Sequence, residues 1–257
     1  MTTPSVAIVT GASSGIGRAT ALRLARDFGV VVLVARDQGG LDEAATAVRR
    51  IGAEALTQAI DLQDPQSAKA VIDQTLARHG RIDALLNIAG AVPQVNLFDM
   101  TDAQWDGGMA VKFHTARRLT MRAWDALKAS RGSVVFMSGS AALAPAPANA
   151  AVAAINAAIT ALAKAFAEQG IADGVQVNSV LPGAVMTERR RAFFEQWAPA
   201  HQMTVDAAIA AFPARVGSAR LGTPEEIADL MAYLVSPAAK WMTGSAVRID
   251  GGEIKNV

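Results

Sequence analysis

The fold of this 257-residue chain is decided by one turn near its start, Thr10-Gly11-Ala12-Ser13-Ser14-Gly15-Ile16-Gly17. The apolar run Val6–Val9 before it is typical of a short buried strand, and a helix carrying Leu24 and Phe28 on one face is predicted after it. Glycine has no Cβ and adopts positive φ, so the turn can approach a pyrophosphate that the helix N–H groups bind. A tight strand-to-helix turn alone would also use glycines. The position in the first such turn of the chain is what favours a dinucleotide site.

Strand and helix signals alternate along the rest of the chain. Val30–Ala35 is a continuous β-branched run, which is typical of a parallel strand buried on both faces. No linker or change of composition interrupts the alternation, so we predict one α/β domain over residues 1–257, doubly wound around a seven-stranded parallel sheet. Further strands are predicted over 55–60, 84–88, 133–138, 175–181 and 246–249, with helices over 41–51, 64–79, 101–128, 149–168 and 223–235.

Capping signals mark the starts of three of these helices. Asp64-Pro65 predicts a cap followed by a first-turn proline. Thr101 with Gln104, and Thr223 with Glu226, form capping-box patterns. Gly107-Gly108 is expected to loosen or break the helix that begins near Thr101.

Composition and charge exclude several classes of site. The formal net charge is +1, and the one short basic run, Arg189-Arg190-Arg191, is more typical of a solvated helix face than of a nucleic-acid patch. The absence of cysteine excludes disulfides and thiolate nucleophiles, and His79, His114 and His201 lie too far apart to give a metal-binding spacing. No signal-peptide pattern opens the chain, and no uncharged apolar run approaches the roughly 18 residues of a membrane helix. We therefore expect a soluble, cytoplasmic protein with no metal, membrane or nucleic-acid partner.

Five segments, in order, resemble motifs of the short-chain dehydrogenase/reductase family, and the resemblance runs from about Val6 to Gly252. It implies a Rossmann-type fold and an oxidoreductase that moves hydride between a nicotinamide cofactor and a carbonyl or alcohol substrate. The segments are the TGxxxGxG turn Thr10–Gly17, the pair Asp61-Leu62, the NNAG-like Asn87-Ile88-Ala89-Gly90, the PGxxxT stretch of Pro182, Gly183 and Thr187, and the closing Asp250-Gly251-Gly252. The resemblance assigns cofactor binding to Gly11, Ser13, Ser14, Gly15, Ile16, Gly17, Arg36, Asp61, Leu62, Asn87, Ala89, Gly90, Asn156, Pro182, Gly183, Val185 and Thr187.

The end of the second strand indicates which cofactor is preferred. An acidic residue there holds the ribose 2′-hydroxyl of NAD, whereas an arginine accommodates the 2′-phosphate of NADP. This chain has Ala35-Arg36, and the forked guanidinium suits a phosphate, with Ser13 as a further donor. We therefore expect NADP(H) rather than NAD(H). The alternative is that Arg36 extends into solvent and that Asp37 weakens the phosphate site.

The catalytic positions depart from the family pattern. Family members donate a proton from a tyrosine, bind ribose with a lysine four residues later, hydrogen-bond the carbonyl through a serine, and hold a water with an asparagine. These positions fall on Val152, on Asn156, on Gly139 (or Ser140 if the loop is one residue shorter) and on Lys112. The single tyrosine, Tyr233, lies in a late helix, and there is no lysine between 128 and 164, so no shift of register restores the pair.

Two hypotheses follow from this loss. A positioned general acid contributes about 10²–10⁴-fold to rate, and valine has no proton to donate. The first hypothesis is an NADP-dependent oxidoreductase with another proton donor, in which Lys112 replaces the charge lost at position 156 and Ser140 or Ser138 polarises the carbonyl. The second is a catalytically inactive nucleotide-binding homologue, a sensor or a partner subunit. An ordinary surface lysine is the alternative for Lys112.

The segment 187–216 is predicted to be a substrate lid. Its apolar residues are expected to form a hydrophobic pocket for a small, apolar substrate or a packed helical flap, with 94–100 as the facing wall. The resemblance also implies a homodimer or homotetramer formed through the helices around 105–128 and 149–168. The apolar lid residues are Phe193, Phe194, Trp197, Met203 and Phe212.

Overall fold

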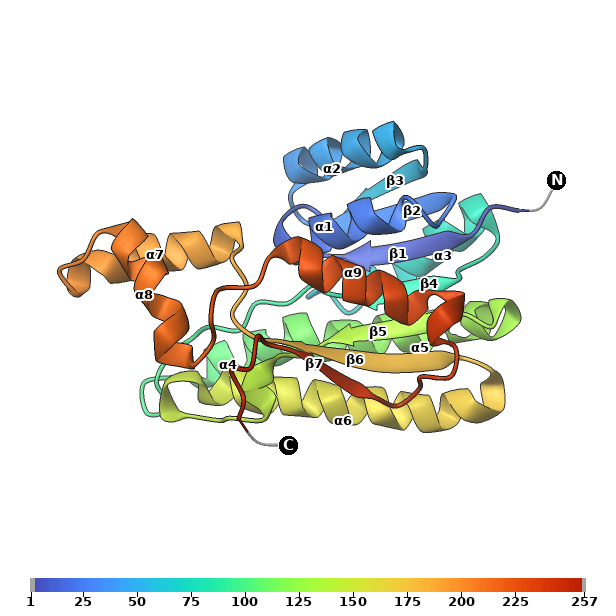
Figure 1. The fold of residues 1–257 in the computed structure, drawn as a ribbon. Coiled ribbons are helices and arrows are strands. Elements are labelled where there is room, and N and C mark those ends of the chain that lie inside the picture. The colour runs from blue at the N-terminus through green and yellow to red at the C-terminus, as the bar shows by residue number, and fades with distance from the viewer. Residues whose placement is uncertain (1–2, 256–257) are drawn as a thin grey trace.

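Seven parallel strands form one sheet in the order β3-β2-β1-β4-β5-β6-β7 in the computed structural model, which describes residues 3–255 (Figure 1). The strand order reverses between β1 and β4, which places a crevice at the carboxyl ends of those two strands. The predicted doubly wound sheet is therefore confirmed. The strands are β1 (Val6–Thr10), β2 (Val30–Ala35), β3 (Glu54–Ala59), β4 (Ala84–Asn87), β5 (Ser133–Met137), β6 (Gln176–Pro182) and β7 (Ala246–Ile249).

Helices cover both faces of the sheet, because each parallel connection needs a crossover. One face packs against α1 (Gly15–Leu24), α2 (Gln38–Ile51) and α9 (Pro224–Val235). The opposite face packs against α3 (Ser67–His79), α5 (Thr115–Ser130) and α6 (Ala150–Asp173). Every residue of β2 is buried, as its β-branched run predicts.

Two helix termini differ from the sequence prediction. Helix α1 ends at Leu24, because the next residues form a turn in which Phe28 N bonds to Leu24 O, so Phe28 lies outside the helix. Asp64-Pro65 does not begin α3. The Asp64 carboxylate instead accepts a hydrogen bond from Gln66 N (2.8 Å) in a local turn, and the helix starts at Ser67.

The predicted helix over 101–128 is continuous but changes its winding. The Thr101 capping box opens α4 (Asp102–Gly108), a π-helical turn η1 (Met109–His114) follows, and α5 then continues to Ser130. The two glycines do not break the helix. A Cβ on Gly108 would lie 2.9 Å from Ile155 Cδ1, so Gly108 serves close packing against α6.

Helix α6 is longer than the sequence predicted, because it continues to Asp173 rather than ending near Glu168. Residues 147–173 form a helix that is long and apolar enough to cross a membrane by length and composition, so the expectation that no such stretch exists is wrong. In this fold its inner side, including Ile155, Ile159 and Ala163, is buried. Ile159 and Ala163 pack with β-sheet residues, which makes α6 a core helix.

The segment after β6 folds into two helices that project beyond the sheet, α7 (Glu188–Ala200) and α8 (Val205–Val216) (Figure 1). Thr187 caps α7 by accepting a hydrogen bond from Arg190 N (3.2 Å). Phe194, Ala198 and Ala208 form a small buried core between the two helices. The segment is therefore a packed helical flap with its own apolar centre.

Candidate active site

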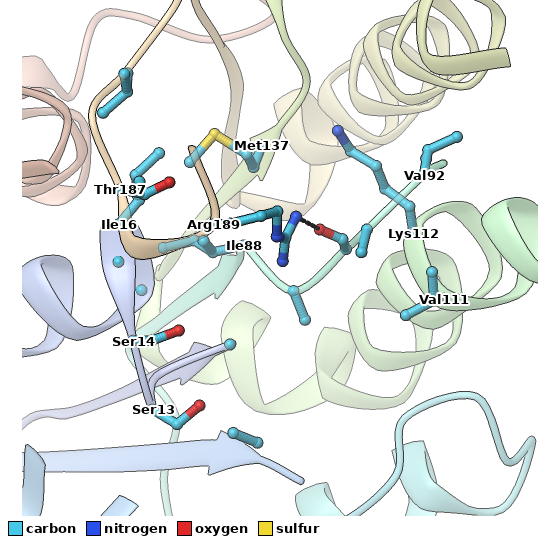
Figure 2. Close-up of a pocket in the computed structure, with 18 of the residues that line it drawn as sticks. Ser13, Ser14, Ile16, Ile88, Val92, Val111, Lys112, Met137, Thr187 and Arg189 are labelled. Atoms are coloured by element: carbon cyan, nitrogen blue, oxygen red, sulfur yellow. Dashed lines mark hydrogen bonds between the residues drawn. The ribbon is translucent and has the colours of Figure 1, made fainter. Parts of the chain in front are cut away.

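One cavity of about 760 Å³ opens at the carboxyl ends of β1 and β4. Figure 2 shows Ser13 and Ser14 of the glycine turn at one end of it and Lys112 with Val92 and Val111 at the other. The cavity thus has a turn of backbone amides at one end and a mixed apolar and cationic wall at the other.

The glycine turn has the geometry of a phosphate cradle. Gly11 has a φ of 70°, and a Cβ on Gly17 would overlap the carbonyl oxygen of Gly11. Ser14 caps α1 without a side-chain hydrogen bond, so amides of the first helical turn are left for a ligand. The residues present therefore fit a bound pyrophosphate.

Thr10 fixes this turn to the loop after β4. Its hydroxyl donates to Leu86 O (3.2 Å) and accepts from Ile88 N (2.9 Å) and Ala89 N (3.0 Å). The Ala89–Gly90 backbone is thereby held against Gly11, whose absent Cβ would lie 3.2 Å from Ala89 Cα.

Arg36 and Asp37 lie at the end of β2, and their side chains have different roles. Arg36 is exposed and lines the cavity. The Asp37 carboxylate caps α2 by accepting a hydrogen bond from Gly39 N (3.1 Å). A carboxylate engaged at a helix N-terminus is stabilised there, which leaves Arg36 as the residue that can meet a 2′-phosphate.

The predicted cofactor residues gather around this cavity, with one exception. Sixteen of them line it, and Asn87 lies beneath, where its side-chain amide donates to Thr120 Oγ1 (3.1 Å). Val152 and Lys112 line the cavity as well, whereas Ser140 does not.

Lys112 projects from the π-helical turn η1 to the floor of the cavity. Its Nζ donates to Asn156 Oδ1 and to Ser138 O (3.2 Å). The stem packs over Gly90, where a Cβ would lie 2.9 Å from Lys112 Cγ. Burial, with a smaller contribution from Arg189, lowers the pKa of Lys112 from 10.5 to about 8. The surface-lysine alternative is therefore wrong, because the ammonium lies inside the site against the residue at position 156.

Comparison with known proteins assigns the fold to a family. The family profile described as Enoyl-(Acyl carrier protein) reductase matches residues 11–253. The short-chain reductase protein NovJ of Streptomyces niveus is 33% identical, with 96% of this chain and 93% of NovJ covered. The 3-oxoacyl-[acyl-carrier-protein] reductase FabG of Escherichia coli is 30% identical, with 96% of each chain covered. This chain belongs to the short-chain dehydrogenase/reductase family.

Solved structures of this family agree closely with the fold. L-sorbose reductase from Gluconobacter frateurii, complexed with NADPH and L-sorbose, superposes with a TM-score of 0.94 at 27% identity, covering 98% of this chain and 97% of the other. An actinorhodin polyketide ketoreductase with NADPH superposes with a TM-score of 0.92 at 27% identity, covering 98% of each chain.

The serine position of the short-chain dehydrogenase/reductase pattern is closed by Asn156. A Cβ on Gly139 would lie 2.6 Å from Asn156 Nδ2, so a serine there would collide with the amide. The neighbouring Ser140 is buried, and its interaction with Glu253 partly offsets the burial that raises the pKa of that carboxyl. Ser140 does not line the cavity, so the alternative that a shorter loop brings Ser140 to the serine position is wrong. Ser138 lines the cavity, but its hydroxyl donates to Asn156 O (2.9 Å).

The interpretation of Arg189-Arg190-Arg191 as one solvated face is wrong. Successive helical residues point about 100° apart, so three adjacent side chains cannot share a face. Arg189 reaches across the cavity and donates to Gly90 O (3.2 Å) (Figure 2). Arg190 lies over the Phe193 and Phe212 rings, and Arg191 is exposed. The usable signal was their position directly after Thr187, at the mouth of the predicted site.

The residues predicted to form a lid divide between the cavity and the core between α7 and α8. Phe193 lines the cavity, whereas Phe194, Trp197, Met203 and Phe212 pack in the α7–α8 core. Of the predicted facing wall, Gln94 lines the cavity, and Phe98 is 90% exposed. His114 and His201 lie outside the cavity, with His201 stacked on Trp197 at 3.8 Å.

Proposed function

We propose that this protein is an NADP(H)-dependent oxidoreductase that interconverts a carbonyl and an alcohol, with Lys112 in place of the missing tyrosine and lysine. The observation that carries the proposal is the Lys112 ammonium bound to Asn156 in the same cavity as the glycine turn. The NADPH complexes of L-sorbose reductase and of the actinorhodin ketoreductase support the choice of cofactor.

The glycine turn, Arg36, Asp61-Leu62 and Pro182-Gly183 would hold the cofactor, whose reduced form supplies a hydride to the carbonyl carbon. Lys112 has three N–H donors, of which Asn156 Oδ1 and Ser138 O take two. The third is free to donate its proton to the carbonyl oxygen as negative charge develops there, and water then reprotonates the amine. A pKa of about 8 keeps this proton in place at neutral pH and makes it transferable.

The test is NADPH oxidation over a broad panel of ketones and aldehydes, compared between the native protein and Lys112→Gln. Turnover that falls at least 100-fold in the variant is the expected result. Turnover unaffected by the variant would contradict the role of Lys112.

A second candidate function is NADP(H) binding without turnover, as a sensor or a partner subunit. It is favoured by Val152 and Gly139, which offer neither a proton nor a hydroxyl where the family uses both. NADPH that binds tightly but is not oxidised with any carbonyl of the panel would establish this function instead.

Replacing Arg36 by alanine is expected to raise the Kd for NADPH about tenfold and to leave that for NADH within twofold. A charge-assisted contact contributes about 1.5–3 kcal/mol, and exposure to solvent reduces this towards the lower value. Calorimetric titration with both cofactors measures the difference, and Arg26→Ala, an exposed arginine outside the cavity, is the matched control. Equal losses for NADPH and NADH would contradict the assignment of Arg36 to the phosphate.

We also propose that the protein is a cytoplasmic homodimer or homotetramer. The helices proposed to meet leave apolar side chains in solvent, with Met121 on α5 57% exposed and Ile171 on α6 65% exposed. Sedimentation equilibrium is expected to give two or four chains per particle, and a monomer at micromolar concentration would contradict this.

A further inference from the structure

The substrate end of the cavity carries two cations that no protein carboxylate neutralises. Lys112 Nζ bonds only neutral oxygens, those of Asn156 and Ser138, and the hydrogen bond of Arg189 goes to a backbone carbonyl, Gly90 O. Among residues 3–255 neither cation has a carboxylate within ion-pair distance. The lowering of the Lys112 pKa by Arg189 means that the two charges act on each other.

The acidic residues that line the cavity lie at its other end or are engaged elsewhere. Asp37 caps α2, and Asp61 accepts a hydrogen bond from Gln63 N (3.0 Å). Glu188 lies against the glycine turn, with Oε2 3.6 Å from where a Cβ of Gly15 would be. The neighbouring Arg190 lies over the rings of Phe193 and Phe212, and the charge of Glu253 partly offsets the burial that lowers the pKa of Arg190. Positive charge is therefore concentrated between Lys112 and Arg189.

Apolar side chains line the cavity around Lys112, whereas Arg189 is exposed at its mouth. Val92 and Val111 flank Lys112 in Figure 2, and Val152 and Phe193 line the same region. Low-polarity walls strengthen the attraction of a cation pair for an anion and disfavour an uncharged polar ligand.

We propose that the substrate is an oxo carboxylic acid with an apolar chain, its carboxylate bound by Arg189 and its oxo oxygen placed at Lys112. The proposal rests on the proposed function, which it deepens by naming the substrate class. The reaction would be a two-electron reduction to a hydroxy acid, for which the bound reduced nicotinamide would supply the hydride to the oxo carbon and Lys112 would donate the proton to the oxygen. Arginine suits the carboxylate because its fork matches the two oxygens.

The experiment measures binding rather than turnover. The probes are 2-hydroxyhexanoate and 3-hydroxyhexanoate, with the methyl ester of each as the uncharged match. They are titrated calorimetrically into the protein at pH 7 and low ionic strength, with and without saturating NADPH. At least one hydroxy acid is expected to bind ten times or more tightly than its ester. Arg189→Gln and Lys112→Gln are each expected to reduce that preference at least fivefold.

Arg191→Gln is the matched control, because Arg191 is on the same helix and is exposed like Arg189 but does not line the cavity. Acid and ester binding equally, or Arg191→Gln reducing the preference as much as Arg189→Gln, would overturn the proposal. Binding of NADPH alone tests the proposed function and is interpreted separately from the comparison of acid and ester. If NADPH fails to bind, the proposed function fails, and the acid-to-ester comparison on the cofactor-free protein still decides the anion site.

Discussion

Carbonyl reduction by the Lys112→Asn variant is expected to rise about 10²–10³-fold when Val152 and Asn156 are also replaced in it, by tyrosine and lysine. A positioned general acid contributes about 10²–10⁴-fold, and the phenol at position 152 would supply one directly in the cavity wall. The upper part of that range is not expected, because Gly139 still offers no hydroxyl to the carbonyl.

The three changes have to be made together because of the contact between Lys112 and Asn156. Asn156→Lys alone would place a second ammonium where Lys112 Nζ now binds Asn156 Oδ1, and two cations in a partly buried site repel each other. Lys112→Asn removes that repulsion. We therefore expect the Val152→Tyr, Asn156→Lys double variant to be less stable and less active than the triple variant.

The measurement is kcat/KM for NADPH oxidation with a panel of ketones and oxo acids. The triple variant in which Val152 becomes phenylalanine is the control, because it matches the bulk of tyrosine without the hydroxyl. Equal activity of the tyrosine and phenylalanine versions would contradict a proton-transfer role for position 152. The Kd for NADPH of both triple variants is expected to stay within a few-fold of the native value, so that a difference in kcat/KM reports the chemical step rather than cofactor binding.

The residues predicted to bind the cofactor line one cavity, except for Asn87, because the sequence constraints on them are local. The glycines of 11–17 are required by backbone contacts within the turn, and Arg36 follows its strand directly. The seven-stranded parallel sheet and the burial of β2 followed from the alternation of apolar runs and helical patterns, whereas the strand order did not.

The substrate half could not be predicted to the same depth, because it depends on side chains from distant elements. Whether Lys112 faces solvent or Asn156 is decided by the π-helical turn η1, for which the sequence carries no signal beyond the glycines before it. Arg189 enters the cavity only because α7 begins at Glu188, directly after its cap Thr187, and its first turn faces the loop at Gly90. The closure of Gly139 by Asn156 is likewise a three-dimensional contact.

The position of Lys112 has a cost in stability, and Lys112→Met is expected to gain roughly 3 kcal/mol in free energy of unfolding, relative to the native protein, between pH 10.5 and pH 7. Burial is the main cause that lowers its pKa from 10.5 to about 8, which corresponds to roughly 3 kcal/mol against the charged form. Losing the hydrogen bonds to Asn156 Oδ1 and Ser138 O opposes this gain by about 1.5–3 kcal/mol for each bond, so the change of stability with pH is the quantity that tests the cost.

The pH dependence separates this cause from simple apolar packing. Between pH 8 and 10.5 the unfolded lysine holds a proton that the folded one has released, so the native protein gains stability as pH rises through that window. The advantage of Lys112→Met should therefore be full below pH 8 and shrink towards pH 10.5, as measured by urea unfolding of both proteins across the range.

The control variant is Lys164→Met, at an exposed lysine paired with Glu168. Its free energy of unfolding should stay within about 0.5 kcal/mol of the native value throughout. A constant advantage from pH 7 to 10.5 would mean that methionine stabilises by packing alone. If Lys112→Met is more stable than the native protein but loses turnover, this lysine is retained for function at the expense of stability.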